Sequence, residues 1–159
     1  MIFVTLGTQK FPFDRLLRQL DALAQQGAIT EPVLVQSGYS SYQPRHLTCR
    51  PFMAREEFVR VMAQAELVIA HGGTGAIVGA LKLGKKVLAV PRLAKYGEHV
   101  DDHQCQIVEA FSATGLLCAC YEGDDLLAQI EKTRRSTFAA FHSNTEAFLA
   151  AIDEDIQNL

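Results

Sequence analysis

Val68-Ile69-Ala70-His71-Gly72-Gly73-Thr74-Gly75-Ala76 is the stretch of the chain that decides its fold. The apolar run over residues 67–70 predicts a buried strand, and a helix-like run over residues 74–83 follows the glycines. A strand that enters a helix through a glycine turn leaves backbone N–H groups uncovered at the positive end of that helix. The stretch therefore predicts a strand-turn-helix unit with a place for a phosphate, although a tight turn without a ligand could have the same sequence.

The same alternation of strand and helix runs through the rest of the chain. Short apolar runs predict strands, and apolar residues at helical spacing predict helices. The predicted strands are residues 2–6, 32–36, 47–52, 67–70, 86–90 and 116–120, and the predicted helices are residues 13–25, 55–65, 74–83, 101–115, 124–132 and 136–156. Because such alternation with short connections is typical of a parallel sheet covered on both faces, we expect an α/β fold with one Rossmann-like domain.

The length of 159 residues suits a single domain that buries its own core, so we expect one domain over residues 1–159. Residues 136–159 form a C-terminal helical extension in this prediction, with Phe138, Phe141, Phe148 and Ile152 as its apolar residues. An amphipathic helix usually covers the core of its own domain, so we favour docking on this domain over docking on a partner chain.

Composition and charge exclude several classes of protein. A net charge of −3 gives no electrostatic basis for binding DNA or RNA. The four cysteines form no CxxC pair and are expected to be reduced. We find no secretion signal at the start of the sequence and no apolar run near the roughly 20 residues that span a bilayer. The expected location is the cytoplasm, and a partner would have to bring the chain to a membrane.

A dense polar cluster follows the strand predicted at residues 86–90. Its members are Glu98, His99, Asp101, Asp102, His103 and Gln104. Rigid carboxylates and amides suit the hydroxyl groups of a sugar, which is the interpretation we favour. A metal-dependent hydrolase is an alternative, because His99 and His103 would share a helix face, but Val100 stands where HExxH helices have glutamate. In a third interpretation the two aspartates only cap the start of a helix.

A further glycine turn, Gly7-Thr8, ends the first predicted strand and can hold a second edge of a diphosphate or be an ordinary connection. The carboxyl ends of parallel strands share one edge of a sheet, where ligands bind. Gly7-Thr8, residues 71–75 and residues 91–104 should therefore meet there. The chain lacks the GxGxxG of dinucleotide enzymes, the Lys-Ser/Thr of a P-loop and the GxSxG of hydrolases. This convergence favours a nucleotide-sugar site.

Three motifs, in this order, resemble the donor-binding C-terminal half of GT-B glycosyltransferases of family 28. They are Val4-Thr5-Leu6-Gly7-Thr8 with Phe13-Asp14-Arg15-Leu16, then His71-Gly72-Gly73-Thr74-Gly75, then Pro91-Arg92 with Gly97-Glu98-His99-Val100-Asp101-Asp102-His103-Gln104. The resemblance covers about residues 1–120. It extends to the short, separately encoded catalytic subunits of exopolysaccharide and capsule glycosyltransferases, and to the soluble subunit of the eukaryotic two-subunit UDP-GlcNAc transferase.

The resemblance implies a UDP-sugar donor and inverting transfer to a lipid-linked saccharide, without a cofactor or an essential metal. The residues implied for the nucleotide and its diphosphate are Gly7, Thr8, Phe52, Met53, His71, Gly72, Gly73, Thr74 and Gly75. The residues implied for the donor sugar are Glu98, Asp102, His103 and Gln104. The backbone of Met53 would read the uracil. His71 is the candidate catalytic residue, but the role we favour for it is to orient the glycine turn or the donor.

A GT-B site lies between two Rossmann-like halves, and this chain has room for only one. The resemblance therefore implies a membrane-anchored partner that supplies the acceptor half. One departure from the family is Gly79, where many relatives carry a glutamate that binds the ribose. A noncatalytic nucleotide-binding or regulatory subunit is thus an alternative. Gly79 also weakens a helix, so we expect it to permit close packing or the approach of a ligand.

Overall fold

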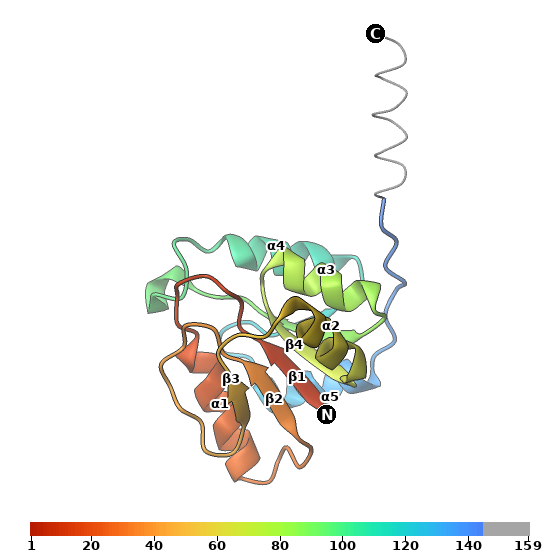
Figure 1. The fold of residues 1–159 in the computed structure, drawn as a ribbon. Coiled ribbons are helices and arrows are strands. Elements are labelled where there is room, and N and C mark those ends of the chain that lie inside the picture. The colour runs from red at the N-terminus through yellow and green to blue at the C-terminus, as the bar shows by residue number, and fades with distance from the viewer. Residues whose placement is uncertain (145–159) are drawn as a thin grey trace, which may run out of the picture.

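The computed structural model describes residues 1–144, which form a parallel sheet between two layers of helices (Figure 1). The sheet order is β3-β2-β1-β4-β5-β6, and all neighbouring strands are parallel. The strands are β1 (Ile2–Thr5), β2 (Val33–Gln36), β3 (Thr48–Arg50), β4 (Leu67–His71), β5 (Lys86–Val90) and β6 (Cys118–Ala119). The helices are α1 (Asp14–Gln25), α2 (Arg55–Gln64), α3 (Thr74–Lys82), the 3-10 helix η1 (Ala94–Tyr96), α4 (His103–Ala113) and α5 (Leu126–Arg135). The predicted Rossmann-like fold is confirmed, and the strand order reverses between β1 and β4.

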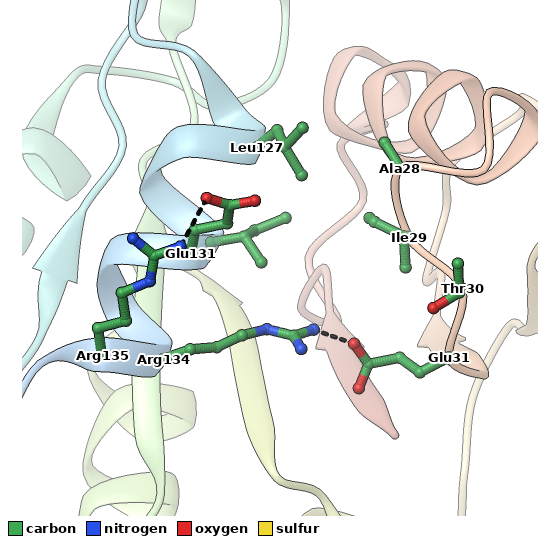
Figure 2. Close-up of a pocket in the computed structure, with 9 residues that line it drawn as sticks. Ala28, Ile29, Thr30, Glu31, Leu127, Glu131, Arg134 and Arg135 are labelled. Atoms are coloured by element: carbon green, nitrogen blue, oxygen red, sulfur yellow. Dashed lines mark hydrogen bonds and ion pairs between the residues drawn. The ribbon is translucent and has the colours of Figure 1, made fainter.

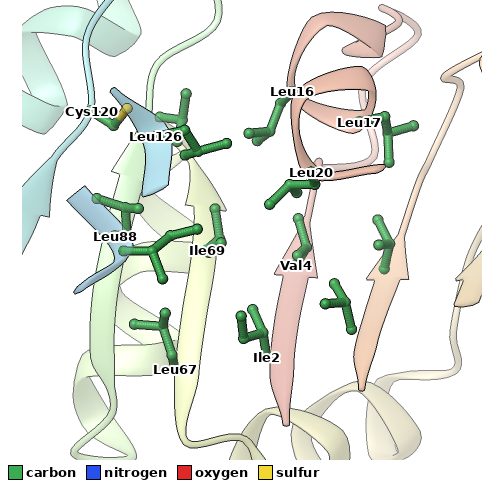
Figure 3. Packing of buried hydrophobic residues seen from close by; sticks show 14 of the residues in the cluster. Ile2, Val4, Leu16, Leu17, Leu20, Leu67, Ile69, Leu88, Cys120 and Leu126 are labelled. Carbon is green, nitrogen blue, oxygen red and sulfur yellow. The ribbon is translucent and has the colours of Figure 1, made fainter. Parts of the chain in front are cut away.

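Two hydrophobic clusters cover the two faces of the sheet. Successive strand residues point to opposite faces, so Ile2 and Val4 join one cluster while Phe3 joins the other. Helices α1 and α5 cover the first face, as the packing of Leu16, Leu20 and Leu126 over the strands shows (Figure 3). Helices α2, α3 and α4 cover the second. Because both faces are buried, the central strands β1, β2, β4 and β5 are largely apolar, which is why they could be located from the sequence.

Two aspartates on α1 hold the long connection between β2 and β3. Asp14 accepts hydrogen bonds from Ser41 and from the backbone of Tyr42. Asp21, seven residues later on the same helix face, accepts them from the Tyr42 hydroxyl, from the backbone N–H groups of Arg45 and His46, and from the His46 ring. The connection is therefore fastened along α1, with Tyr39 at the carboxyl end of the sheet.

Replacement of Asp21 tests how much this fastening contributes to stability. Burial would raise the pKa of the Asp21 carboxyl, but hydrogen bonds from Tyr42, His46 and Arg45 outweigh it and hold the pKa below its ordinary value of 3.8. The stabilisation is therefore present above pH 3.8 and is lost as the pH falls through the lowered pKa. We expect Asp21→Ala to lower the unfolding free energy at neutral pH by about 2–4 kcal/mol. Urea unfolding between neutral and acidic pH measures this, and equal stability of variant and wild type at neutral pH would contradict it.

The C-terminal extension differs from its prediction. Residues 136–144 form no helix, and residues 145–159 lie outside the described part of the chain. Phe138 packs on the cluster beneath α1 and α5, whereas Phe141 packs on the cluster on the other face. Helical backbone would put these two residues, three apart, on one helix face. An extended chain lets them reach both faces of the sheet.

Gly79 lies inside α3, and the expectation that it permits close helix packing is wrong. A Cβ atom built at Gly79 would have Met62 Sδ as its nearest neighbour, at 4.0 Å, which is an ordinary contact distance. Glycine in a helix interior costs stability relative to alanine, so we expect Gly79→Ala to raise the unfolding free energy by about 0.5–1 kcal/mol. Chemical denaturation measures the change, and a less stable variant would show that the site needs glycine for another reason.

Candidate functional site

Two of the predicted site segments meet where the strand order reverses. Thr5, the last residue of β1, lies opposite Ala70 of β4, so the turns that follow these two strands are neighbours. The first turn begins with Gly7 and the second is His71-Gly72-Gly73. In open α/β sheets a crevice forms at this position, outside the carboxyl ends of the strands. The two predicted phosphate-binding turns are thus brought together.

The ring of His71 lies between the two turns. Its Nδ1–H donates a hydrogen bond to the Thr5 carbonyl oxygen, at 3.2 Å. A Cβ atom at Gly7 would lie 2.8 Å from His71 Nε2, and one at Gly73 only 2.2 Å away, so both positions require glycine for close approach. Burial, with a smaller effect from the charge of Arg92, lowers the pKa of His71 to about 4. The ring is therefore neutral at physiological pH.

The amino terminus of α3 opens at the same place. Gly73 is its N-cap residue, and no side chain within residues 1–144 caps the helix by a hydrogen bond. The first N–H groups of a helix have no partner within the helix, and the helix dipole makes this end positive. Thr74 and Gly75 are exposed, and a Cβ atom at Gly75 would meet no atom of the described chain within 4 Å. This end of α3 can therefore receive an anion.

Gln104 joins the glycine turn to the end of β5. Its side chain is buried, and its Oε1 accepts hydrogen bonds from the backbone N–H groups of Gly72 and Arg92, both at 3.1 Å. A Cβ atom at Gly72 would lie 2.6 Å from Gln104 Cβ, so glycine there lets α4 pack against the turn. Because the amide oxygen is used within the protein, any contact with a ligand falls to the amide nitrogen.

Glu98 is held inside the protein, unlike Asp102 and His103, which are exposed. It is 3% exposed, and its carboxylate accepts two hydrogen bonds from the Arg15 guanidinium, at 2.9 and 3.0 Å, and one from the Leu93 N–H. Sequence reasoning gave Arg15 no role, because the two residues of this pair are 83 positions apart. The ion pair fixes the loop between β5 and α4 against α1.

The start of α4 also differs from its prediction. The helix begins at His103, so His99 precedes it and the two histidines do not share a helix face. His99 stacks on Phe11 and its ring contacts Asp101, whose Oδ1 accepts a hydrogen bond from the His103 N–H. Asp101 thus bonds the first turn of α4, whereas Asp102 accepts a hydrogen bond from the Ala94 N–H. Within residues 1–144 no group of three His, Cys, Asp or Glu side chains could hold a metal ion.

Phe52 and Met53 follow β3, at the same edge of the sheet. Phe52 is half-exposed and packs edge-to-face on Tyr39, with ring centroids 5.3 Å apart. The Met53 N–H donates a hydrogen bond to Gln36 Oε1, at 3.1 Å. The predicted reading of a base by the Met53 backbone must therefore use its carbonyl group or displace Gln36. Neither Tyr39 nor Gln36 was a predicted site residue.

Two cavities differ in their position relative to the candidate site. One, of about 320 Å³, adjoins the polar cluster and is lined by Pro91, Leu93, Lys95, Asp102, Cys105, Tyr121 and Glu122. Another, of about 260 Å³, lies between α5 and the segment before β2, where Arg134 pairs with Glu31 (Figure 2). Glu31 also pairs with the amino group of Met1, so this second cavity is at the amino ends of the strands. Of these two cavities, the first adjoins the candidate site through Asp102.

Comparison with known families agrees with this geometry. The profile of the glycosyltransferase family 28 C-terminal domain matches residues 1–158. The chain belongs to this family. Family and fold together support a glycosyltransferase. A search of curated proteins gives no match.

Solved structures similar to this family 28 chain are GT-B glycosyltransferases or parts of them. The NMR solution structure of ALG13 matches with a TM-score of 0.60 and 18% identity, over 96% of this chain and 94% of ALG13. The glycotransferase of kitacinnamycin matches with a TM-score of 0.63 and 14% identity, over 85% of this chain and 35% of that enzyme. MurG of Acinetobacter baumannii matches with a TM-score of 0.54 and 18% identity, over 84% of this chain and 39% of MurG. The chain thus spans little more than a third of the last two enzymes. No helix within residues 1–144 is long and apolar enough to cross a membrane.

Proposed function

We propose that this chain is the donor-binding catalytic subunit of a two-component inverting glycosyltransferase. In this proposal it transfers a sugar from a UDP-sugar to a lipid-linked saccharide in the synthesis of an exopolysaccharide or capsule. The observation that carries the proposal is the neutral ring of His71, held between two glycine turns beside the uncapped amino terminus of α3. Family membership supports a nucleotide-sugar donor for this site.

The diphosphate would lie against the Gly7-Thr8 turn and the first turn of α3. As the bond between sugar and diphosphate breaks, negative charge grows on the departing nucleotide. Uncovered N–H groups and the helix dipole stabilise such charge without a metal ion. We assign His71 to the diphosphate and not to the acceptor, because the glycine turns enclose its Nε2. An anion beside it favours the protonated ring, so nucleotide binding is expected to raise the pKa of His71.

The donor sugar would be held by Gln104, Asp102 and His103. Asp102, the N-cap residue of α4, and His103, its first residue, are exposed, and Asp102 also lines the cavity of about 320 Å³. Glu98 has a different part in this proposal: its ion pair with Arg15 positions the loop. Phe52, beside Tyr39, would border the uracil.

The acceptor half would come from a membrane-anchored partner chain. Several exposed apolar side chains lie in connections that follow strands, at the carboxyl edge of the sheet, which faces the second half in a GT-B enzyme. They are Tyr39, Phe52, Tyr96 and Val100. Val100 is 74% exposed, so its apolar side chain is available for contact with a second chain.

A transfer assay tests this function. The purified chain is added, with radiolabelled UDP-sugars, to membranes from its own organism in which the chromosomal gene has been deleted. Label should enter the lipid fraction only when the chain is added, and EDTA should not prevent it. If the chain binds UDP but no label enters the lipids, the result would favour a noncatalytic nucleotide-binding subunit. The basis of that alternative is Gly79, which stands where many relatives carry a glutamate.

A further inference from the structure

Arg92 is a buried cation that the proposed function does not yet use. It directly follows Pro91 at the end of β5, and it is 1% exposed. Its guanidinium donates hydrogen bonds only to backbone carbonyl groups, those of Leu6, Phe11 and Glu98. Its Nε is buried without a hydrogen-bond partner in the described chain. A charge in such surroundings is costly to bury, so its presence calls for an explanation.

No carboxylate compensates Arg92 directly. Within residues 1–144 it forms no ion pair, and the nearby Glu98 carboxylate is bound by Arg15. Burial lowers the pKa of Arg92, and the charge of Glu98 partly opposes this. An arginine remains protonated in such conditions. Arg15, Arg92 and Glu98 together therefore carry one net positive charge, while the neighbouring His71 is neutral.

This charge lies beneath both glycine turns. Its guanidinium binds the carbonyl of Leu6, the residue before Gly7. Its backbone N–H shares Gln104 Oε1 with Gly72 of the second turn. The charge also acts on His71, where it adds to the effect of burial in lowering the pKa. The other groups that act on the His71 ring are the Thr5 carbonyl, which raises its pKa, and His99, which lowers it.

We propose that Arg92 is the fixed counter-charge of the diphosphate site and acts from below the turns without touching the nucleotide. This inference rests on the proposed function and adds to it the source of the positive charge. A divalent cation would neutralise a diphosphate by direct contact, whereas the buried guanidinium of Arg92 acts at a distance through a medium of low dielectric constant. Arg92 is a positioning residue as well, because its guanidinium ties the connection between β1 and α1 to the loop between β5 and α4.

The test compares ligands that differ only in phosphate charge. Wild type, Arg92→Gln and Arg92→Lys are titrated calorimetrically with UDP, UMP and uridine in EDTA. Arg92→Gln should bind UDP about tenfold or more weakly, while its affinity for uridine is unchanged. Arg60→Gln, which removes the same charge from the exposed face of α2, is the matched control and should leave the ratio of UDP to uridine affinity as in wild type.

Two further measurements separate charge from structure. NMR titration of His71 without nucleotide should show its pKa rising from about 4 toward the ordinary value in Arg92→Gln. In Arg92→Lys, UDP affinity should decline as the pH rises, because burial lowers the pKa of a lysine into the accessible range. That variant decides the matter if Arg92→Gln does not fold. An equal loss of UDP and uridine affinity, or pH-independent UDP binding by Arg92→Lys, would overturn the inference alone. Failure of the wild type to bind UDP would overturn the proposed function and this inference with it.

Discussion

Alanine at Gly73 should lower the rate of sugar transfer by about 100-fold, because a displacement of about 1 Å at a reacting centre has effects of this size. The added Cβ atom would lie 2.2 Å from His71 Nε2, and the next two ring atoms are only 2.9 and 3.1 Å away. The ring is held on its other side by the Thr5 carbonyl, so it must break that bond or push the turn away from it. Either movement changes the place of the diphosphate.

Transfer kinetics and UDP titration of Gly73→Ala measure the effect. Gly79→Ala is the folding control, since it adds the same methyl group to α3 where the nearest atom is 4.0 Å away. Circular dichroism should show both variants folded. Transfer by Gly73→Ala within a few-fold of wild type would show that the ring of His71 is not part of the working site.

Two substitutions at Gln104 should separate its structural part from its part in the reaction. Gln104→Leu leaves the Gly72 and Arg92 N–H groups buried without an acceptor, so we expect the unfolding free energy to fall by about 2–4 kcal/mol. Gln104→Glu keeps an acceptor for both groups, and the positive charge of the neighbouring Arg92 offsets part of the cost of burying a carboxylate, so it should retain more stability than Gln104→Leu. It replaces the amide nitrogen with a carboxylate oxygen, so we expect transfer to be lost nonetheless.

Urea unfolding and the transfer assay, applied to both variants, give the comparison. His103→Gln is a useful reference, because His103 is exposed and its substitution should leave stability unchanged within about 0.5 kcal/mol. If Gln104→Glu transfers sugar as fast as wild type, the amide nitrogen does not contact the donor, and Gln104 only holds the turn in place.

The fold could be predicted because its determinants are local. Buried parallel strands are apolar runs, and the glycines after β4 mark the turn, so the strands and α-helices up to α5 were located to within a few residues, whereas η1 was not predicted. The helix predicted at residues 136–156 is wrong over residues 136–144, because Phe138 and Phe141 pack on opposite faces of the sheet. Helical spacing alone cannot show this, since a periodic pattern does not say which surfaces the residues meet.

The site could be predicted only in part, because a local sequence pattern does not show which distant residues will be in contact. The turns at Gly7 and Gly73 were identified by their glycines, and β-sheet topology brings them together. The role of Glu98 depends on its contact with Arg15, which is 83 positions away in the sequence. The role of Arg92 depends on contacts as distant as that with Leu6, which is 86 positions away. Glu98 looks like a sugar ligand in the sequence because nothing near it shows that Arg15 will occupy its carboxylate.

Calorimetric titration of the full chain with UDP in the presence of EDTA tests the central claim most directly. UMP, uridine, ADP and GDP serve as comparison ligands. If two glycine turns and the start of α3 form a diphosphate site, UDP will bind with EDTA present, more tightly than UMP and far more tightly than ADP or GDP. Equal binding of UDP and uridine, or UDP binding that appears only when a divalent cation is added, would contradict the account.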